Sequence, residues 1–350
     1  MAVELFVYSL AICLALLFFW SFKRLPQEGW QIIASVPMGK VSDDQWSGLN
    51  LTYYGFFIAN SCVLAASIGL VLLRSIHLPI SAILAIIGGL FALAVPSARL
   101  IAGLVEKKAN TFTTAGACFV GSLTLPLIIA GLNTTLGREG GWSIPMIPAL
   151  AVAAIAYAYG EGIGRLACIS FGCCYGRPVE RLHPFLQRIF NSVNFTFFGK
   201  TKKAAYEGGL EGQRVIPIQA ITAVIYAAIA LIGTYLFLTS HFVAATAVSV
   251  IGVQIWRSIS EIFRADYRGA GRISSYQIMA IIMAFYVTAL LFLLPVNSVA
   301  APNLIDGLLS LWNPVIILAL LSLWVTMFLY TGRSRVTGSI VSFLVHHDRI

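Results

Sequence analysis

Long apolar segments alternate with short polar ones along most of the chain. A helix that crosses the roughly 30 Å hydrocarbon core of a bilayer needs about 20 apolar residues. Segments of about this length lie at 4–22, 51–73, 79–98, 112–132, 145–163, 217–239, 242–257, 276–295 and 313–331. The pattern therefore predicts an all-α fold, a polytopic membrane bundle of about nine transmembrane helices.

Two departures from this alternation carry information. The polar segment 165–216 is long enough for a polar or re-entrant subdomain between the fifth and sixth spans. The short span 242–257 runs into "WRSISEIFR", so its helix is predicted to extend beyond the hydrocarbon.

Residues 1–22 lack the basic start and the following cleavage site of a signal peptide, which predicts a retained membrane helix.

Composition excludes a soluble protein. Hydrophobic residues make up 59% of the 350 residues and charged residues only 11%, whereas soluble domains carry about 25% charged residues. The net charge of +9 suits contact with anionic lipid headgroups. The chain has no basic stretch interleaved with aromatic residues, so no nucleic-acid partner is predicted.

The basic residues fall mainly on one side of the predicted bundle. If nine spans alternate sides, one face carries Arg74 and Arg138, and the opposite face carries the other 21 of the 23 Lys and Arg residues. The positive-inside rule would make the basic face cytoplasmic.

The stretch "GRLACISFGCCYGRP", residues 164–178, combines basic, thiol and glycine residues at the end of the fifth span. Gly172 and Gly176 allow backbone conformations that other residues resist. Irregular backbone at membrane depth is tolerated only around a cavity or within protein, so this stretch is predicted to form a cavity wall. The spacing of Cys168, Cys173 and Cys174 lacks the paired pattern and fourth ligand of structural zinc sites, so no metal is predicted. A reactive thiolate beside the arginines is a second possibility.

A second stretch, "WRSISEIFRADYRG" at 256–269, places Arg257, Glu261 and Arg264 on one helical face. A glutamate between two arginines would orient their guanidinium groups while leaving donors for another anion. The alternative is an ordinary solvated face at a helix end. A third stretch, "LTYYGFFIA" at 51–59, would on its own indicate an interfacial aromatic belt.

Together these stretches resemble the prolipoprotein diacylglyceryl transferase family. Its signature G-R-x-G-N-F-x-N-G-E-x-x-G-R is matched at Gly164, Arg165, Gly172, Gly176 and Arg177. Further family motifs resemble Tyr54-Gly55, Pro217-x-Gln219, and Arg257, Glu261, Phe263 and Arg264. Several positions depart from the family pattern, and four of them replace polar groups that could serve the chemistry: Cys168 replaces an asparagine, Cys173 an acidic residue, Thr114 a histidine, and Thr222 a glutamate.

The resemblance implies a fold and an activity. A seven-helix core would span 51–295, with 1–50 and 296–350 each adding one helix. The family transfers a diacylglyceryl group from phosphatidylglycerol to a lipobox cysteine thiol and releases glycerol phosphate, without a cofactor. It acts at the outer face of the bacterial plasma (inner) membrane, opposite to the face that the charge count favours.

The resemblance also implies roles for individual residues. Arg165, Arg257 and Tyr54 are the expected catalytic groups. Expected substrate-binding residues are Glu261, Arg264, Arg177, Gly172, Gly176, Cys168, Cys173, Gln219 and Thr114. The lost histidine favours a changed acceptor, and the candidate acceptors are a protein, a glycan and another lipid. The alternatives are a non-catalytic protein that binds or transports anionic lipid, and an inactive relative that serves as an assembly partner. The oligomeric state is left open.

Overall fold

The computed structural model describes residues 1–106, 113–267, 273–295 and 299–350. Four residues of the predicted basic face, Lys107, Lys108, Arg268 and Arg272, lie outside this part of the chain. Within it, nine helices are long and apolar enough to cross a membrane. They are α1 (Ala2–Arg24), α2 (Tyr53–Ser75), α3 (Ile80–Glu106), α4 (Thr114–Thr134), α6 (Met146–Phe171), α9 (Ile218–Leu238), α10 (Phe242–Phe263), α11 (Ser275–Leu293) and α13 (Pro314–Thr331). The prediction of a polytopic helical membrane protein is confirmed.

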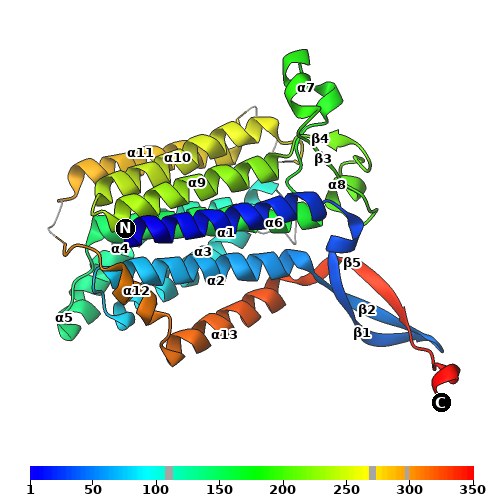
Figure 1. Ribbon diagram of the computed structural model, residues 1–350, viewed down its shortest axis with the longest axis horizontal. Coiled ribbons are helices and arrows are strands. Elements are labelled where there is room, and N and C mark those ends of the chain that lie inside the picture. The colour runs from blue at the N-terminus through cyan, green and yellow to red at the C-terminus, as the bar shows by residue number, and fades with distance from the viewer. Residues whose placement is uncertain (107–112, 268–272, 296–298) are drawn as a thin grey trace.

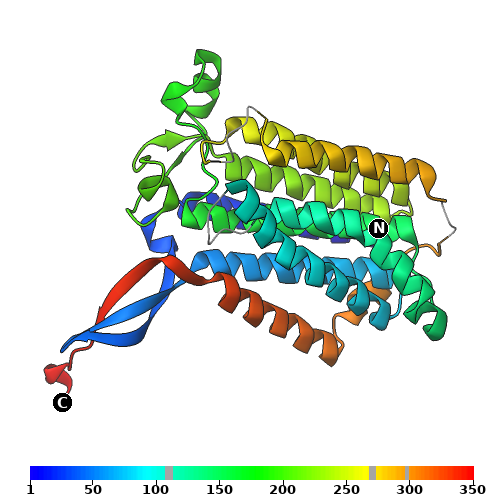
Figure 2. The ribbon, with the colours of Figure 1, turned by 180° about the vertical axis from the view of Figure 1, so that it is seen from behind.

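The long helices run side by side as one bundle (Figures 1 and 2). Helix α6 packs against α2, α9 and α10, while α1 lies on α9 and α13 lies on α2. Small residues on α6 allow this close packing, since a side chain at Gly160 would press on Ala65 of α2, and one at Gly162 on the Ala223 carbonyl of α9. α6 therefore occupies the centre of the arrangement that holds the site.

The irregular segment after the fifth span begins well inside the stretch 164–178. That stretch was predicted to form an irregular cavity wall, but α6 continues as a helix to Phe171. It ends at Gly172, whose φ of 73° lies in the left-handed region, and the Cys173 amide donates to the Cys168 carbonyl at 3.0 Å. The glycines at 160–164 serve helix packing instead, so the irregular segment starts at 172.

Two sheets add to the helices, and neither was predicted. Strands β1 (Ile32–Ser42), β2 (Gln45–Thr52) and β5 (Arg333–Ser342) form an antiparallel sheet in the order β1-β2-β5. This sheet projects from one end of the bundle (Figure 1). Its pairing joins the segment before α2 to the segment after α13, for example Leu49 with Gly338. Segments from the two terminal regions therefore share one sheet.

The segment between α6 and α9 folds at the same end of the bundle as the sheet (Figure 1). It contains η2 (Val179–Arg181), α7 (Pro184–Phe190), β3 (Phe195–Thr196), α8 (Lys203–Tyr206) and β4 (Arg214–Val215), with β3 paired to β4. The remaining short elements are η1 (Glu28–Trp30), α5 (Leu136–Gly140), α12 (Leu304–Ser310) and η3 (His347–Arg349).

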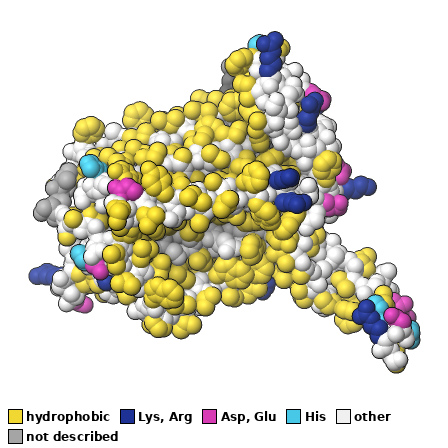
Figure 3. All heavy atoms as spheres, in the orientation of Figure 1, with side chains coloured by type: hydrophobic (Ala, Val, Ile, Leu, Met, Phe, Trp, Pro, Cys, Tyr) yellow, Lys and Arg dark blue, Asp and Glu magenta, His cyan; other side chains and the backbone are white. Residues whose placement is uncertain are grey.

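The charged side chains gather at the ends of the bundle. On the face shown in Figure 3, most Lys and Arg side chains lie at the end that carries the sheet and the 172–216 segment, and apolar side chains cover the middle. Helix α5, which contains Arg138, lies at the opposite end. This distribution agrees with the charge asymmetry predicted from the sequence.

Candidate functional site

A cavity of about 1030 Å³ lies among α2, α3, α4, α6 and α10, and it also borders the start of β5. Much of its wall is apolar, with residues such as Ile86, Leu90 and Ala153. Its polar lining includes Tyr54, Thr114, Glu161, Arg165, Cys168, Cys173, Cys174, Arg257, Glu261 and Arg264. A cavity with both apolar walls and a charged region suits an amphipathic ligand such as a phospholipid.

The two predicted arginines meet at one carboxylate. Arg165 donates to Oε1 of Glu161, and Nη2 of Arg257 lies 3.4 Å from the same oxygen. The Glu161 side chain is only 5% exposed. Arg165 and Glu161 sit one turn apart on α6, while Arg257 comes from α10. Arg165 and Arg257, which the resemblance implied to be catalytic groups, therefore converge in the structure.

Sequence reasoning missed Glu161, although a signal was available. Glu161 is an acidic residue inside an apolar span, and ionisable residues in such positions are functional candidates by default. Its spacing of four residues from Arg165 is also that of a helical ion pair. Thr114, at the first turn of α4, lies beside the same carboxylate. Thr114, expected to bind substrate, thus lines the cavity close to the arginine pair.

Glu261 was expected to lie between Arg257 and Arg264, and this is wrong for Arg257. Arg257 donates to the Tyr157 hydroxyl at 2.7 Å and pairs with Glu161. Glu261 lies 3.6 Å from Arg264, which also forms a two-pronged pair with Asp266 at 2.8 Å. The helix ends at Phe263 and Arg264 has extended backbone, so it does not continue the helical face.

Tyr54 is positioned by the sheet that the sequence analysis did not predict. It follows β2 directly at the start of α2, and its ring packs edge-on against Phe171 at 5.8 Å between ring centroids. Thr52 caps this helix by accepting from the Gly55 amide, and its hydroxyl donates to the Gly332 carbonyl at 3.0 Å. A side chain at position 55 would overlap the Gly332 backbone, so this close approach requires glycine.

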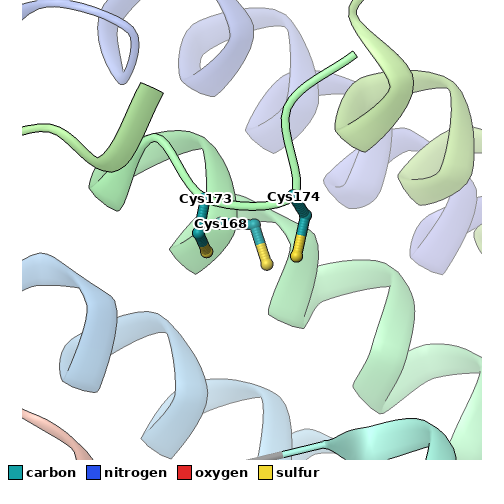
Figure 4. Close-up of side chains that lie close together, drawn as sticks. All are labelled: Cys168, Cys173 and Cys174. Atoms are coloured by element: carbon teal, nitrogen blue, oxygen red, sulfur yellow. The ribbon is translucent and has the colours of Figure 1, made fainter. Parts of the chain in front are cut away.

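Three cysteines gather at the end of α6, where the chain turns back at Gly172. The sulfur atoms of Cys168, Cys173 and Cys174 all lie within 4.8 Å of one another, and Figure 4 shows them on the same side of the turn. Gln219 donates to the Cys173 carbonyl at 2.9 Å and so supports this turn. The spacing along the chain argued against a metal, but the folded turn places three donor atoms together.

Four residues expected to bind substrate lie outside the described cavity lining and contact the backbone of the loop after α6. The side chain of Arg177 is exposed and does not line the cavity, whereas its amide donates to the Phe263 carbonyl at 2.9 Å. Gly176 pairs with Arg264 in a β-bridge, and a side chain there would overlap Ile216. Gly172 and Gln219 likewise lie outside the cavity lining. These four residues shape the loop that carries the cysteines.

The cavity also has cationic residues that the sequence analysis did not assign to it. They are Arg99, Lys203, Arg333 and Arg335. Arg99 of α3 stacks over the Tyr330 ring at 4.7 Å. Among the lining residues, seven are Lys or Arg and four are Asp or Glu, which favours an anionic ligand. Arg333 and Arg335 reach the cavity only because β5 pairs with β2.

Lys202, beside the cysteine turn, is fully buried. Its Nζ donates to the Ser170 carbonyl at 2.7 Å and to the Leu25 carbonyl at 3.0 Å, which ties the end of α6 to the end of α1. Burial lowers the pKa of Lys202 from its ordinary 10.5 to about 7.

This shift predicts a pH-dependent stability. Between pH 7 and 10.5 the unfolded chain binds a proton at Lys202 that the folded chain lacks, so stability rises with pH and is lost as pH falls to about 7. Raising the pH from 7 to 9 should stabilise the protein by up to about 1.4 kcal/mol per pH unit relative to Lys202→Met. Thermal unfolding in detergent at both pH values measures the difference. If the stability of the wild type and of Lys202→Met changes equally between pH 7 and 9, the lowered pKa of Lys202 is contradicted.

A comparison with known protein families agrees with this geometry. The family model described as prolipoprotein diacylglyceryl transferase matches residues 45–293, which is well over half of the chain. A search of curated proteins gives no match. The matched range contains the arginine pair, Tyr54 and the cysteine turn. The chain therefore belongs to the prolipoprotein diacylglyceryl transferase family.

Proposed function

We propose that this protein transfers a diacylglyceryl group from phosphatidylglycerol to the thiol of an acceptor protein. The observation that carries the proposal is the pair Arg165 and Arg257, held by Glu161 in a cavity with apolar walls and an excess of cationic residues. The apolar walls suit acyl chains, and the cations suit a phosphodiester. Membership of the family supports a transferase of this class.

The arginine pair has donors available for the phosphate. Nε of Arg165 is buried and has no hydrogen-bond partner among the described residues. A buried donor without a partner is unfavourable, and a lipid phosphate oxygen would satisfy it. Tyr54, which lines the same cavity, would donate a hydrogen bond from its hydroxyl to the headgroup.

The proposed reaction is a displacement at carbon. The acceptor thiol releases its proton to water and its sulfur forms a bond to the glyceryl carbon that carries the phosphate. The carbon–oxygen bond between that carbon and the phosphate breaks. Glycerol phosphate leaves with one more negative charge than the phosphodiester had. Arg165 and Arg257 would stabilise this growing charge, as preorganised donors do in sites that exclude water.

The reaction should depend on the anionic lipid and on Arg165. Purified protein in phosphatidylglycerol vesicles, given a cysteine-containing peptide, should release glycerol phosphate and increase the peptide mass by one diacylglyceryl group. Phosphatidylcholine vesicles should give no product, and Arg165→Ala should reduce the rate by at least about 100-fold. Arg177→Ala is the control, because that side chain is exposed outside the cavity.

Three outcomes would reject this proposal. The first is that the wild-type protein forms no product. The second is that Arg165→Ala reacts at the same rate as the wild type. The third is that the protein binds the lipid but forms no product. If the diacylglyceryl group is transferred to a compound with a hydroxyl group and not to the peptide thiol, the acceptor is a glycan or a lipid.

The proposal includes a place in the bacterial plasma membrane with the cavity end facing outward. The family acts where exported prolipoproteins arrive, whereas the positive-inside rule favours the opposite face. The same assay with a membrane-impermeant peptide distinguishes the faces, since only an outward-facing cavity would act on peptide added to intact spheroplasts.

A further inference from the structure

The cysteine turn has the form of a preorganised thiol cluster. Cys168 lies in the last turn of α6, and Cys173 and Cys174 follow the left-handed Gly172. All three line the cavity, and their sulfur atoms lie within 4.8 Å of one another (Figure 4). Two structural elements bring the thiols together, the end of α6 and the loop that follows it.

The backbone of the turn is held in an unusual conformation. Cys174 has a φ of 56°, in the left-handed region that residues other than glycine seldom adopt. Such strain persists where the surrounding structure imposes it, and it is common at functional sites. The Tyr175 carbonyl accepts from the Ala265 amide at 3.0 Å, and Gln219 holds the Cys173 carbonyl. This conformation lets adjacent cysteines direct their sulfur atoms to the same side (Figure 4).

We propose that Cys168, Cys173 and Cys174 bind one zinc ion through three thiolates and leave its fourth position open to the cavity. Zinc binds cysteine sulfur at about 2.3 Å in tetrahedral geometry, which separates ligand sulfurs by about 3.8 Å. Thiols already within 4.8 Å need to move by only about 1 Å to reach this geometry. Three protein ligands and one open position are the arrangement of catalytic zinc sites.

The charges around the cluster favour the metal-bound form. Three thiolates and a divalent cation carry one net negative charge, which the surplus of cationic residues in the cavity would balance. Arg165 and Lys203 both interact electrostatically with the cysteines of the cluster. These positive charges would offset the negative charge that three metal-bound thiolates bring to the cavity.

The zinc site would supply what the chain lacks for activating an acceptor, and this step rests on the proposed function. The described lining of the cavity contains no histidine, and Thr114, which lies beside Glu161, is not a base. An acceptor thiol that binds zinc at the open position loses its proton to water and becomes a bound thiolate. Its sulfur then attacks the glyceryl carbon, and glycerol phosphate departs with the electrons of the broken carbon–oxygen bond.

Metal content and cobalt absorption test the site without reference to activity. Wild-type protein purified without chelators should contain one zinc per chain, and its cobalt form should show thiolate-to-metal charge-transfer absorption. The variants Cys168→Ser, Cys173→Ser and Cys174→Ser should each bind the metal at least about 10-fold more weakly. Cys13→Ser is the matched control, because Cys13 is exposed on α1 outside the cavity. A cooperative thermal unfolding transition would verify that each variant is folded.

The outcomes separate this inference from the proposed function. Loss of metal in the three variants supports the site even if no lipid transfer occurs, in which case the proposed function fails alone. A cysteine-containing peptide should also change the cobalt absorption as its sulfur enters the fourth position. Wild-type protein that binds neither metal, metal binding unchanged in the three variants, or a disulfide within the cluster would overturn the zinc site. Full transfer by metal-free protein would overturn its catalytic part.

Discussion

Replacing Arg257 with alanine should reduce kcat for diacylglyceryl transfer by about 100-fold to 1000-fold, the loss typical of removing one preorganised donor from a site that stabilises developing charge. The Arg257 side chain is only 7% exposed, donates to Tyr157 at 2.7 Å and lies 3.4 Å from Glu161. These two contacts fix the guanidinium group, so its remaining donors are already oriented when the lipid phosphate arrives.

The matching variant Arg257→Lys should show an intermediate loss. Lysine keeps the charge, but its single ammonium cannot contact Tyr157, Glu161 and a phosphate with the geometry of the planar guanidinium. Initial rates of glycerol phosphate release measure both effects. Arg188→Ala is the control, since Arg188 is exposed on α7. A kcat for Arg257→Ala equal to that of the wild type would show that the arginine pair does not act on the reaction.

Replacing Glu161 with glutamine should weaken both folding and activity. The substitution keeps the shape of the side chain but leaves the buried charges of Arg165 and Arg257 close together without their shared carboxylate. Removal of one partner from a buried ion pair typically lowers the free energy of unfolding by about 3–5 kcal/mol. Transfer activity should fall as well, because Arg165 then loses its carboxylate partner and Arg257 is held only by Tyr157.

Glu261→Gln is the matched comparison for this prediction. Its carboxylate pairs with Arg264, which keeps its two hydrogen bonds to Asp266, so the loss of stability should be clearly smaller. Thermal unfolding in detergent measures both variants. In the double variant Glu161→Gln with Arg257→Gln, part of the lost stability should return, because one of the two unpaired charges is gone. Equal destabilisation by Glu161→Gln and Glu261→Gln would show that the shared carboxylate has no special role.

The candidate site was only partly predictable because its members depend on different kinds of information. Arg165, Arg257 and Tyr54 stand in recognisable motifs, and the structure places all three at one cavity. Arg177 stands in the same motif, yet its side chain is exposed. A motif preserves the identity and order of residues, but the direction of a side chain depends on how the following loop folds.

The partners of these residues required the tertiary structure. Glu161 carried a local signal, but only the packing of α6 against α10 shows that it serves Arg257 as well as Arg165. The cysteine cluster shows the same limit, since its spacing along the chain did not match a zinc motif. A turn at Gly172 brings the three thiols together, and that turn is supported by Gln219 from α9.

The sequence by itself determined that the chain forms a helical membrane bundle, where its spans lie and which end carries the charge. These properties follow from local composition, because a bilayer requires each span to be long, apolar and internally hydrogen-bonded. Only the tertiary structure decided that Glu161 joins the two arginines, that three thiols meet, and that β2 and β5 pair across the chain to fix Tyr54. Such contacts join residues from separate elements, and no local pattern of apolar and polar residues specifies which elements become neighbours.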